Sequence, residues 1–244
     1  MKVLRYLTER LQEEKLHMTL IDPEKQPPGE AGSMARTMED MGTDAIMVGG
    51  STGVTQGNLD DTVRGIKGAT NVPVILFPAG AHTISRYADA IYFMSMLNST
   101  STRLLVGEQV EAAKVVKDLG LEAISMGYVI VEPGMKVGEV GFADPIPRDD
   151  PQLAMKYGLA AEFLGMDLFY LEAGSGAPAP VPTEIVRAVK EEISIPLLVG
   201  GGIRSRERAQ ELIEAGADIL VTGTAVERTQ NLEGILDAVR RGNR

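Results

Sequence analysis

The chain has 244 residues, of which 44% are hydrophobic, and its 34 acidic and 24 basic side chains give a net charge of −10. Such an acidic chain lacks the basic surface that non-specific nucleic-acid binding requires, so we expect no nucleic-acid partner. The absence of cysteine excludes disulfides, thiolate metal sites and a cysteine nucleophile. No stretch approaches the roughly 18 apolar residues of a membrane-spanning helix, and the first residues form no apolar leader. We therefore expect a soluble, cytoplasmic protein with no membrane span.

Short apolar runs of strand length alternate with helical patterns along the whole chain, and no linker or low-complexity segment divides it. The expected strands are residues 16–21, 45–48, 74–77, 90–94, 123–131, 168–171, 197–199 and 219–222. The expected helices are residues 31–41, 58–67, 104–119, 151–164, 183–192, 206–214 and 232–241. Eight such strands predict a single domain over residues 1–244, a (β/α)8 TIM barrel whose chemistry lies at the carboxyl ends of the strands.

The connection between the third and fourth strands departs from this pattern. Residues 78–89 contain Pro78 and Gly80, show little helical periodicity and are short for a crossover helix with its loops. We therefore predict that helix 3 is absent, or reduced to a turn or an extended stretch. The connection after the fifth strand, residues 132–149, is long and rich in glycine and proline, and we expect a loop there.

Glycines follow the last three predicted strands. Gly174-Ser175-Gly176 comes after the sixth, residues 200–202 are three glycines after the seventh, and Gly223-Thr224 ends the eighth. Glycine lets backbone N–H groups approach an anion, and the loops after strands 7 and 8 often bind phosphate in this fold. The alternative is that these glycines form only tight turns after buried strands. Their repetition favours a phosphorylated ligand.

Two carboxylates come directly after strands, where a barrel has its mouth. Asp22 suits a magnesium ligand or a general base, and otherwise a helix cap or a turn starter, while Ser51 is a metal ligand or a cap. Glu172 follows Tyr170 at the end of the sixth strand, and could accept a hydroxyl proton or pair with an arginine. We interpret His17, inside the first strand, as structural rather than catalytic.

Apolar side chains near the expected gap in the helical ring allow two interpretations. Residues 92–97 and 104–106 are rich in aromatic, methionine and aliphatic side chains, which is typical of barrel core. A groove for a long apolar chain would require the same kind of residues beside the reduced helix 3. The sequence does not decide between the two.

Six motifs together give the chain a resemblance to a known family. They are HMTLIDPE at residues 17–24, GGST at 49–52, MSMLNS at 94–99, GYVIVEPG at 127–134, YLEAGSGA at 170–177 and GGGIR at 200–204. The chain thereby resembles the geranylgeranylglyceryl phosphate synthases, a prenyltransferase family that includes bacterial heptaprenylglyceryl phosphate synthases. The resemblance covers nearly the whole chain, and the YLEAGSGA block is far more specific than a glycine-rich turn.

The resemblance implies a modified barrel without a regular helix 3, and a reaction. A prenyl group, geranylgeranyl or a similar one, would move from its diphosphate to the 3-hydroxyl of sn-glycerol 1-phosphate, forming the first ether bond of archaeal-type lipids. Asp22 and Ser51 would hold the cofactor Mg²⁺, and Glu172 with Tyr170 would act on the attacking hydroxyl. The residues implied in binding glycerol 1-phosphate are Tyr170, Leu171, Glu172, Ala173, Gly174, Ser175, Gly176, Gly201, Gly202, Gly223 and Thr224.

Two departures within the family bear on subgroup and assembly. Some relatives have a lysine where this chain has Leu20, which places it with the archaeal-type branch. Some members of that branch carry an aromatic residue in the loop after strand 5, aligned here with Glu139, so we expect a homo-oligomer and favour a dimer over a hexamer.

Two other functions fit the same glycine-rich strand ends. A sugar-phosphate isomerase or lyase uses the same phosphate-binding barrel but needs no long apolar groove. A non-catalytic phospholigand sensor would bind phosphate without turnover.

Overall fold

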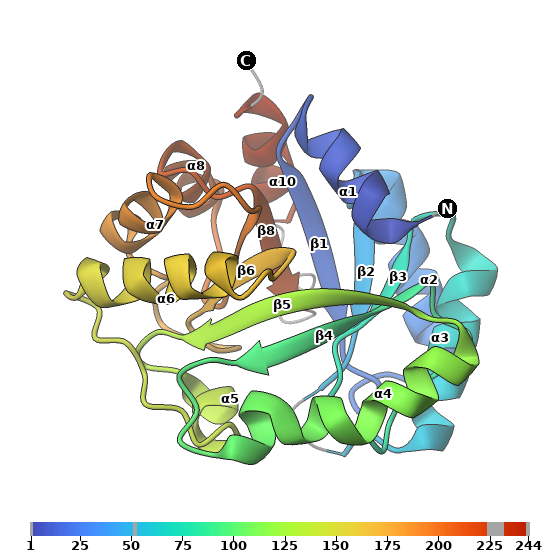
Figure 1. Cartoon of the computed structure of the whole chain (residues 1–244). Helices are drawn as coiled ribbons and strands as arrows, with labels where there is room; N and C mark the ends of the chain where they lie inside the picture. The colour runs from blue at the N-terminus through green and yellow to red at the C-terminus, as the bar shows by residue number, and fades with distance from the viewer. Residues whose placement is uncertain (1, 51–52, 224–231, 243–244) are drawn as a thin grey trace.

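A computed structural model describes residues 2–50, 53–223 and 232–242. Its centre is a closed barrel of eight parallel strands in sequential order, in which β1 pairs with both β2 and β8 (Figure 1). The strands are β1 Leu16–Ile21, β2 Ala45–Val48, β3 Val74–Leu76, β4 Ala90–Met96, β5 Glu122–Ile130, β6 Leu168–Glu172, β7 Leu197–Gly200 and β8 Ile219–Gly223. The predicted (β/α)8 barrel is confirmed.

Helices surround the barrel on its outer side (Figure 1). They are α1 Val3–Leu11, α2 Pro28–Met41, α3 Gln56–Ala69, the π-helix η1 Arg103–Gly107 that continues into α4 Glu108–Leu119, α5 Met135–Val140, α6 Pro151–Phe163, α7 Thr183–Lys190, α8 Arg206–Glu214 and α10 Leu232–Arg241. Each predicted helix is present with ends shifted by a few residues, whereas α1 and α5 were not predicted. In the described part of the chain, no helix is long and apolar enough to cross a membrane.

The helix between β3 and β4 is absent, as predicted. Residues 77–89, all of which the structure describes, form turns and bends without a helix. The chain leaves β3 at Leu76 and enters β4 at Ala90, and the two strands still pair in register through Ile75 with Ala90. The outer layer between β3 and β4 therefore lacks the crossover helix that such a barrel has at this place, and Ile91 of β4 packs in the outer cluster with Ala112 and Val116 of α4.

Side chains alternate between the barrel interior and the outer layer along each strand. In β1, Leu16 and Met18 belong to the interior cluster, whereas Ile21 packs in the outer layer against α2 and α3. Four aromatic rings fill the upper interior: Phe77 lies 5.4 Å from Tyr128 and 6.1 Å from Tyr170, centroid to centroid, and Tyr92 completes the cluster. A packed interior leaves the mouth as the place for chemistry.

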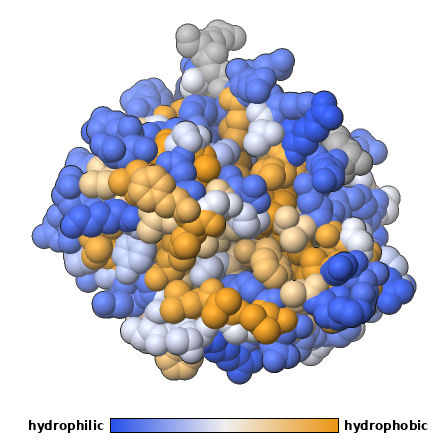
Figure 2. Space-filling view, in the orientation of Figure 1, coloured by the Kyte–Doolittle hydropathy of each residue, from blue (hydrophilic) through white to orange (hydrophobic). Residues whose placement is uncertain are grey.

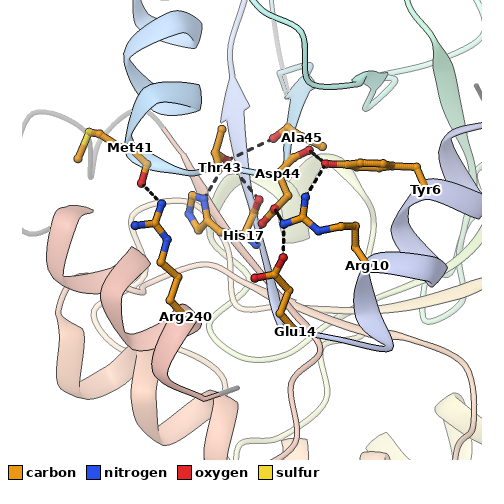
Figure 3. Close-up of polar contacts among 9 residues, drawn as sticks. All are labelled: Tyr6, Arg10, Glu14, His17, Met41, Thr43, Asp44, Ala45 and Arg240. Atoms are coloured by element: carbon orange, nitrogen blue, oxygen red, sulfur yellow. Dashed lines mark hydrogen bonds and ion pairs between the residues drawn. The ribbon is translucent and has the colours of Figure 1, made fainter. Parts of the chain in front are cut away.

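A polar network closes the amino-terminal end of the barrel (Figure 3). The Asp44 carboxylate accepts hydrogen bonds from the backbone N–H of His17 at 2.9 Å and from the Arg10 guanidinium at 2.8 Å. The Arg10 guanidinium also pairs with Glu14, and the Tyr6 hydroxyl donates to the Asp44 carbonyl at 3.2 Å. This network joins α1 to the start of β2, far from the strands' carboxyl ends.

His17 lies within this layer and is structural, as interpreted. Its side chain is fully buried, with Nδ1 2.9 Å from the Thr43 hydroxyl and Nε2 2.9 Å from the Thr222 hydroxyl. Burial lowers the pKa of His17 to about 3, so the ring is neutral in the folded protein at neutral pH.

Protonation of His17 is expected to destabilise the protein in mild acid. Because the folded-state pKa lies below the unfolded value of about 6.5, the unfolded chain gains this proton first, and stability falls as pH drops below 6.5. This residue alone should remove about 2 kcal/mol between pH 7 and pH 5. Denaturant unfolding at both pH values measures it. A His17→Gln variant that keeps the same pH dependence would contradict the assignment.

Candidate active site

Glu172 ends β6 and lies on the same strand face as Tyr170, which belongs to the barrel interior. The residue is 7% exposed; one carboxylate oxygen accepts a hydrogen bond from the Tyr170 hydroxyl at 2.7 Å and the other accepts one from the Gly174 N–H at 2.6 Å. Burial raises the pKa of Glu172, while these two donors oppose the rise. A carboxylate with a raised pKa that remains ionised is a stronger base than an exposed one.

Glycines at the end of β7 allow the side chains of Tyr170 and Glu172 to pack directly against the β7 backbone. A Cβ at Gly200 would lie 2.2 Å from the Tyr170 hydroxyl, and one at Gly201 would lie 2.3 Å from a Glu172 carboxylate oxygen. Gly201 also has φ +81°, a conformation that side-chain-bearing residues rarely adopt. The triple glycine thus permits close packing against Tyr170 and Glu172, in addition to any role as an anion site.

The three predicted glycine-rich strand ends lie at the same end of the barrel. Gly174 is packed against the Gly134 carbonyl, where a Cβ would come within 2.6 Å of its oxygen, and the Gly176 carbonyl accepts Arg204 Nη2 at 2.8 Å. Gly202 has φ +70°. Gly223 ends β8 beside Leu20 of β1, and among the described residues a Cβ there would meet nothing within 4 Å. Thr224 lies outside the described residues.

The predicted binding residues next to Glu172 divide into two groups. Ser175 is exposed at the mouth. Leu171 and Ala173 instead pack in the outer core cluster, so their side chains point away from the barrel axis. Their backbone is largely occupied as well, because Ala173 N–H donates to Gly200 and the Ala173 carbonyl accepts from Gly134.

Asp22 follows β1 at the mouth. Its side chain is 13% exposed, one oxygen accepts the Glu24 N–H at 3.1 Å and the other lies 3.1 Å from Lys25 Nζ. Gly50, after β2, lets this carboxylate pack against its backbone, since a Cβ there would lie 2.4 Å from Asp22 Oδ1. Ser51 lies outside the described residues. Among those described, no group of three or more histidine, aspartate or glutamate side chains could hold a metal. Asp22 fits a magnesium ion only if a ligand's phosphate oxygens complete its coordination.

An apolar groove runs from Glu172 and Ser175 across the mouth to the outer side of β4. Its wall and floor include Leu20, Phe77, Ile84, Ile91, Phe93, Met94, Leu104, Ala112, Val137 and Val140. The groove encloses about 1120 Å³, including its open mouth, and takes the space that the absent helix would fill. Figure 2 shows apolar side chains gathered on this front face, over β4 and β5 and the neighbouring helices.

Sequence reasoning anticipated part of this groove. Residues 92–94 and 104 were recognised as groove or core candidates, and the structure places Tyr92, Phe93, Met94 and Leu104 along it. The contribution of α5 through Val137 and Val140 was missed, as were Glu108 and Gln109 at the start of α4. No local signal marks these residues, because the groove brings together three connections that are distant in the sequence.

Comparison with known proteins agrees with the motifs. The PcrB family model matches residues 9–243. The geranylgeranylglyceryl phosphate synthase of Pyrococcus horikoshii is 55% identical over 99% of this chain and 96% of its own length. The chain belongs to the PcrB family of geranylgeranylglyceryl phosphate synthases. A second PcrB-type relative, the synthase of Methanothermobacter thermautotrophicus, is 53% identical over 96% of this chain and 95% of its own.

A solved structure from the same family has the same fold as this chain. The crystal structure of (S)-3-O-geranylgeranylglyceryl phosphate synthase from Thermoplasma acidophilum, in complex with substrate sn-glycerol-1-phosphate, matches this chain with a TM-score of 0.95. The two are 47% identical over 99% of each chain. The resemblance deduced from the six motifs is thereby confirmed.

Proposed function

We propose that this chain transfers a prenyl group from a prenyl diphosphate, geranylgeranyl diphosphate in the first instance, to the 3-hydroxyl of sn-glycerol 1-phosphate. Membership of the synthase family supports the reaction. The observation that carries it is that Glu172 and Ser175 line the same groove as Ile84 and Leu104. A base at the mouth is thus continuous with an apolar channel, which is what joining a polar acceptor to a lipid chain requires.

Glycerol 1-phosphate would lie between the ends of β6, β7 and β8. Its phosphate would be held by backbone N–H groups of the glycine loops, those of Gly201, Gly202 and Gly223. Anchoring the phosphate here would direct the glycerol hydroxyl toward Glu172, which converts a bimolecular encounter into a positioned attack.

Glu172 would accept the proton of the attacking hydroxyl. The Tyr170 hydroxyl and the Gly174 N–H fix the orientation of the carboxylate, so its position does not depend on the ligand. As the C–O bond to the prenyl carbon forms, the bond from that carbon to the diphosphate breaks and the diphosphate leaves with the electron pair. The hydroxyl proton passes to Glu172.

Asp22 and Ser51 would hold Mg²⁺, and the diphosphate would bind beside Asp22. A bound magnesium ion supplies neutralisation of the charge that develops on the leaving diphosphate. The Asp22 carboxylate lies against the backbone of Gly50 at the mouth and its side chain is 13% exposed, which supports a ligand at this point. In a chain with a net charge of −10, an anionic substrate needs such local compensation.

The prenyl chain would lie in the groove over β4. Each buried CH₂ contributes about 0.8 kcal/mol, so the apolar lining supplies much of the binding energy. This groove also argues against the sugar-phosphate isomerase, because a small polar substrate would leave apolar surface exposed to water along its length. A non-catalytic sensor would not need Glu172 buried and oriented beside the groove.

Assembly and location form part of the same proposal. We favour a dimer, since Glu139 is a charged residue paired with Lys136 at 3.2 Å where an aromatic contact would be needed for a larger ring. Sedimentation of the purified protein tests this by counting chains per particle. A cytoplasmic location follows from the proposed substrates, because charged phosphate esters do not cross membranes unaided.

The direct test is an assay of the purified protein with Mg²⁺, sn-glycerol 1-phosphate and prenyl diphosphates of increasing length. We expect a prenylglyceryl phosphate ether, with the sn-glycerol 3-phosphate enantiomer used much less well. Detection of the product by mass spectrometry decides the result. Absence of the ether with every chain length, or equal use of both enantiomers, would refute the proposal.

A further inference from the structure

Residues 77–89 form one wall of the groove. This segment makes few backbone–backbone hydrogen bonds. Between residues 78 and 88, the described part of the chain gives one backbone–backbone hydrogen bond, from Thr83 N–H to the Gly80 carbonyl at 3.4 Å. A helix at this place would pair its backbone groups internally. The position of the wall must therefore come from contacts with neighbouring elements.

Two polar side chains from the flanking helices make such contacts. Glu108, the first residue of α4, accepts the Ala81 N–H through Oε2 at 2.7 Å. Gln56, the first residue of α3, holds Ile84 from the other side: its Nε2 donates to the Ile84 carbonyl at 3.1 Å, and its Oε1 accepts the Ile84 N–H at 3.3 Å. Ala81 and Ile84 both line the groove.

The Glu108 contact is charge-assisted. Burial raises the pKa of Glu108, but the Ala81 N–H and the Arg103 guanidinium outweigh it and lower the pKa overall, so the carboxylate stays ionised. Hydrogen bonds to an ionised acceptor are about twice as strong as those between neutral groups. Arg103 belongs to η1, whose π-helical turn precedes α4 directly. The ionised Glu108 carboxylate, itself paired with Arg103, thus connects the wall to α4.

We propose that Glu108 and Gln56 are positioning residues. By holding the wall in place they set the width of the groove, and this width determines how well the prenyl chain of the diphosphate substrate binds. Glu108 holds the wall at Ala81 and Gln56 holds it at Ile84, so the two together fix the segment that lines the groove along with Leu104 and Ala112. In the described part of the chain, the hydrogen bonds of these two side chains go to Ala81, Ile84 and Arg103, and not to the glycine loops after β6, β7 and β8. The inference rests on the proposed function, since it concerns the prenyl-binding part of that same site.

The test separates binding of the two substrates. Glu108→Ala is expected to raise the KM for geranylgeranyl diphosphate by about tenfold, with the KM for sn-glycerol 1-phosphate unchanged within about twofold. Glu108→Gln keeps an oxygen that can accept the Ala81 N–H and should recover most of the lost affinity. Gln56→Ala acts on the other end of the wall and should shift the same KM. Glu111→Ala, an exposed residue of α4 with the same change in charge, is the matched control.

A measurement independent of activity accompanies these kinetics. The Ala81 amide should exchange with solvent at least about tenfold faster in Glu108→Ala than in the wild type, because its acceptor is gone. An unchanged Ala81 exchange rate, an equal rise in both KM values, or a Glu108→Gln variant as impaired as Glu108→Ala would overturn the positioning role. A wild-type protein that forms no ether would overturn the proposed function instead, and the exchange experiment would still judge the wall contact.

Discussion

Replacement of Glu172 by glutamine should lower turnover by about 10²- to 10⁴-fold, the range expected when a general base is removed. The glutamine has nearly the same shape, so the barrel and the neighbouring Gly201 need not move. Binding of sn-glycerol 1-phosphate should persist, because the phosphate contacts come from other loops. Steady-state rates and a separate binding titration with glycerol 1-phosphate measure the two effects. Rates near those of the wild type would exclude Glu172 as the base.

The pH dependence supplies a second readout for the same residue. Because burial raises the pKa of Glu172, the acid limb of kcat/KM should lie at a higher pH than an ordinary glutamate would give. Tyr170→Phe removes one donor that lowers this pKa, so its acid limb should move further toward neutral pH. Its turnover should fall by only about tenfold, since the base remains. An acid limb that stays in place would contradict the role of the Tyr170 hydroxyl.

The barrel could be predicted because its strands are local signals. Apolar runs such as residues 197–199 end in glycine, and a proline and a glycine in residues 78–89 mark the absent helix. The helix α1 was missed because it is only nine residues long and its buried Val3 and Leu7 give too short a pattern to stand out. The helix α5 is six residues long within a glycine-rich stretch, and tertiary contacts decide its conformation.

In the candidate site, too, the features that follow from local strand geometry could be predicted from the sequence, and those that depend on the folded chain could not. Tyr170 and Glu172 are two residues apart in β6, so their side chains lie on the same face of the strand. Their approach to each other therefore follows from strand geometry. The groove does not follow from any local rule, because Ile84, Leu104 and Val137 come from three separate connections. The bond from Ala81 to Glu108 spans 27 residues, and only the folded chain reveals it.

Asp22→Asn is the second substitution expected to have a large effect, and it should act on the diphosphate half of the reaction alone. Loss of the carboxylate leaves an amide, a much weaker ligand for Mg²⁺, so the rate at saturating glycerol phosphate should fall by at least about 10²-fold. The dependence of the remaining rate on Mg²⁺ concentration should weaken as well. A magnesium titration of the rate in the wild type and the variant measures both.

Two further variants distinguish a metal-binding role of Asp22 from other effects of its replacement. Asp61→Asn makes the same change in net charge on an exposed part of α3, where Asp61 pairs with Arg64 at 2.7 Å, and should leave the rate unchanged. Lys25 offers a direct alternative, because Asp22 could serve only to hold the Lys25 ammonium, 3.1 Å away, against the diphosphate. In that case Lys25→Ala would reproduce the loss, and the magnesium titration of Asp22→Asn would match that of the wild type. A metal role for Asp22 requires the opposite: a titration shifted in Asp22→Asn and unshifted in Lys25→Ala.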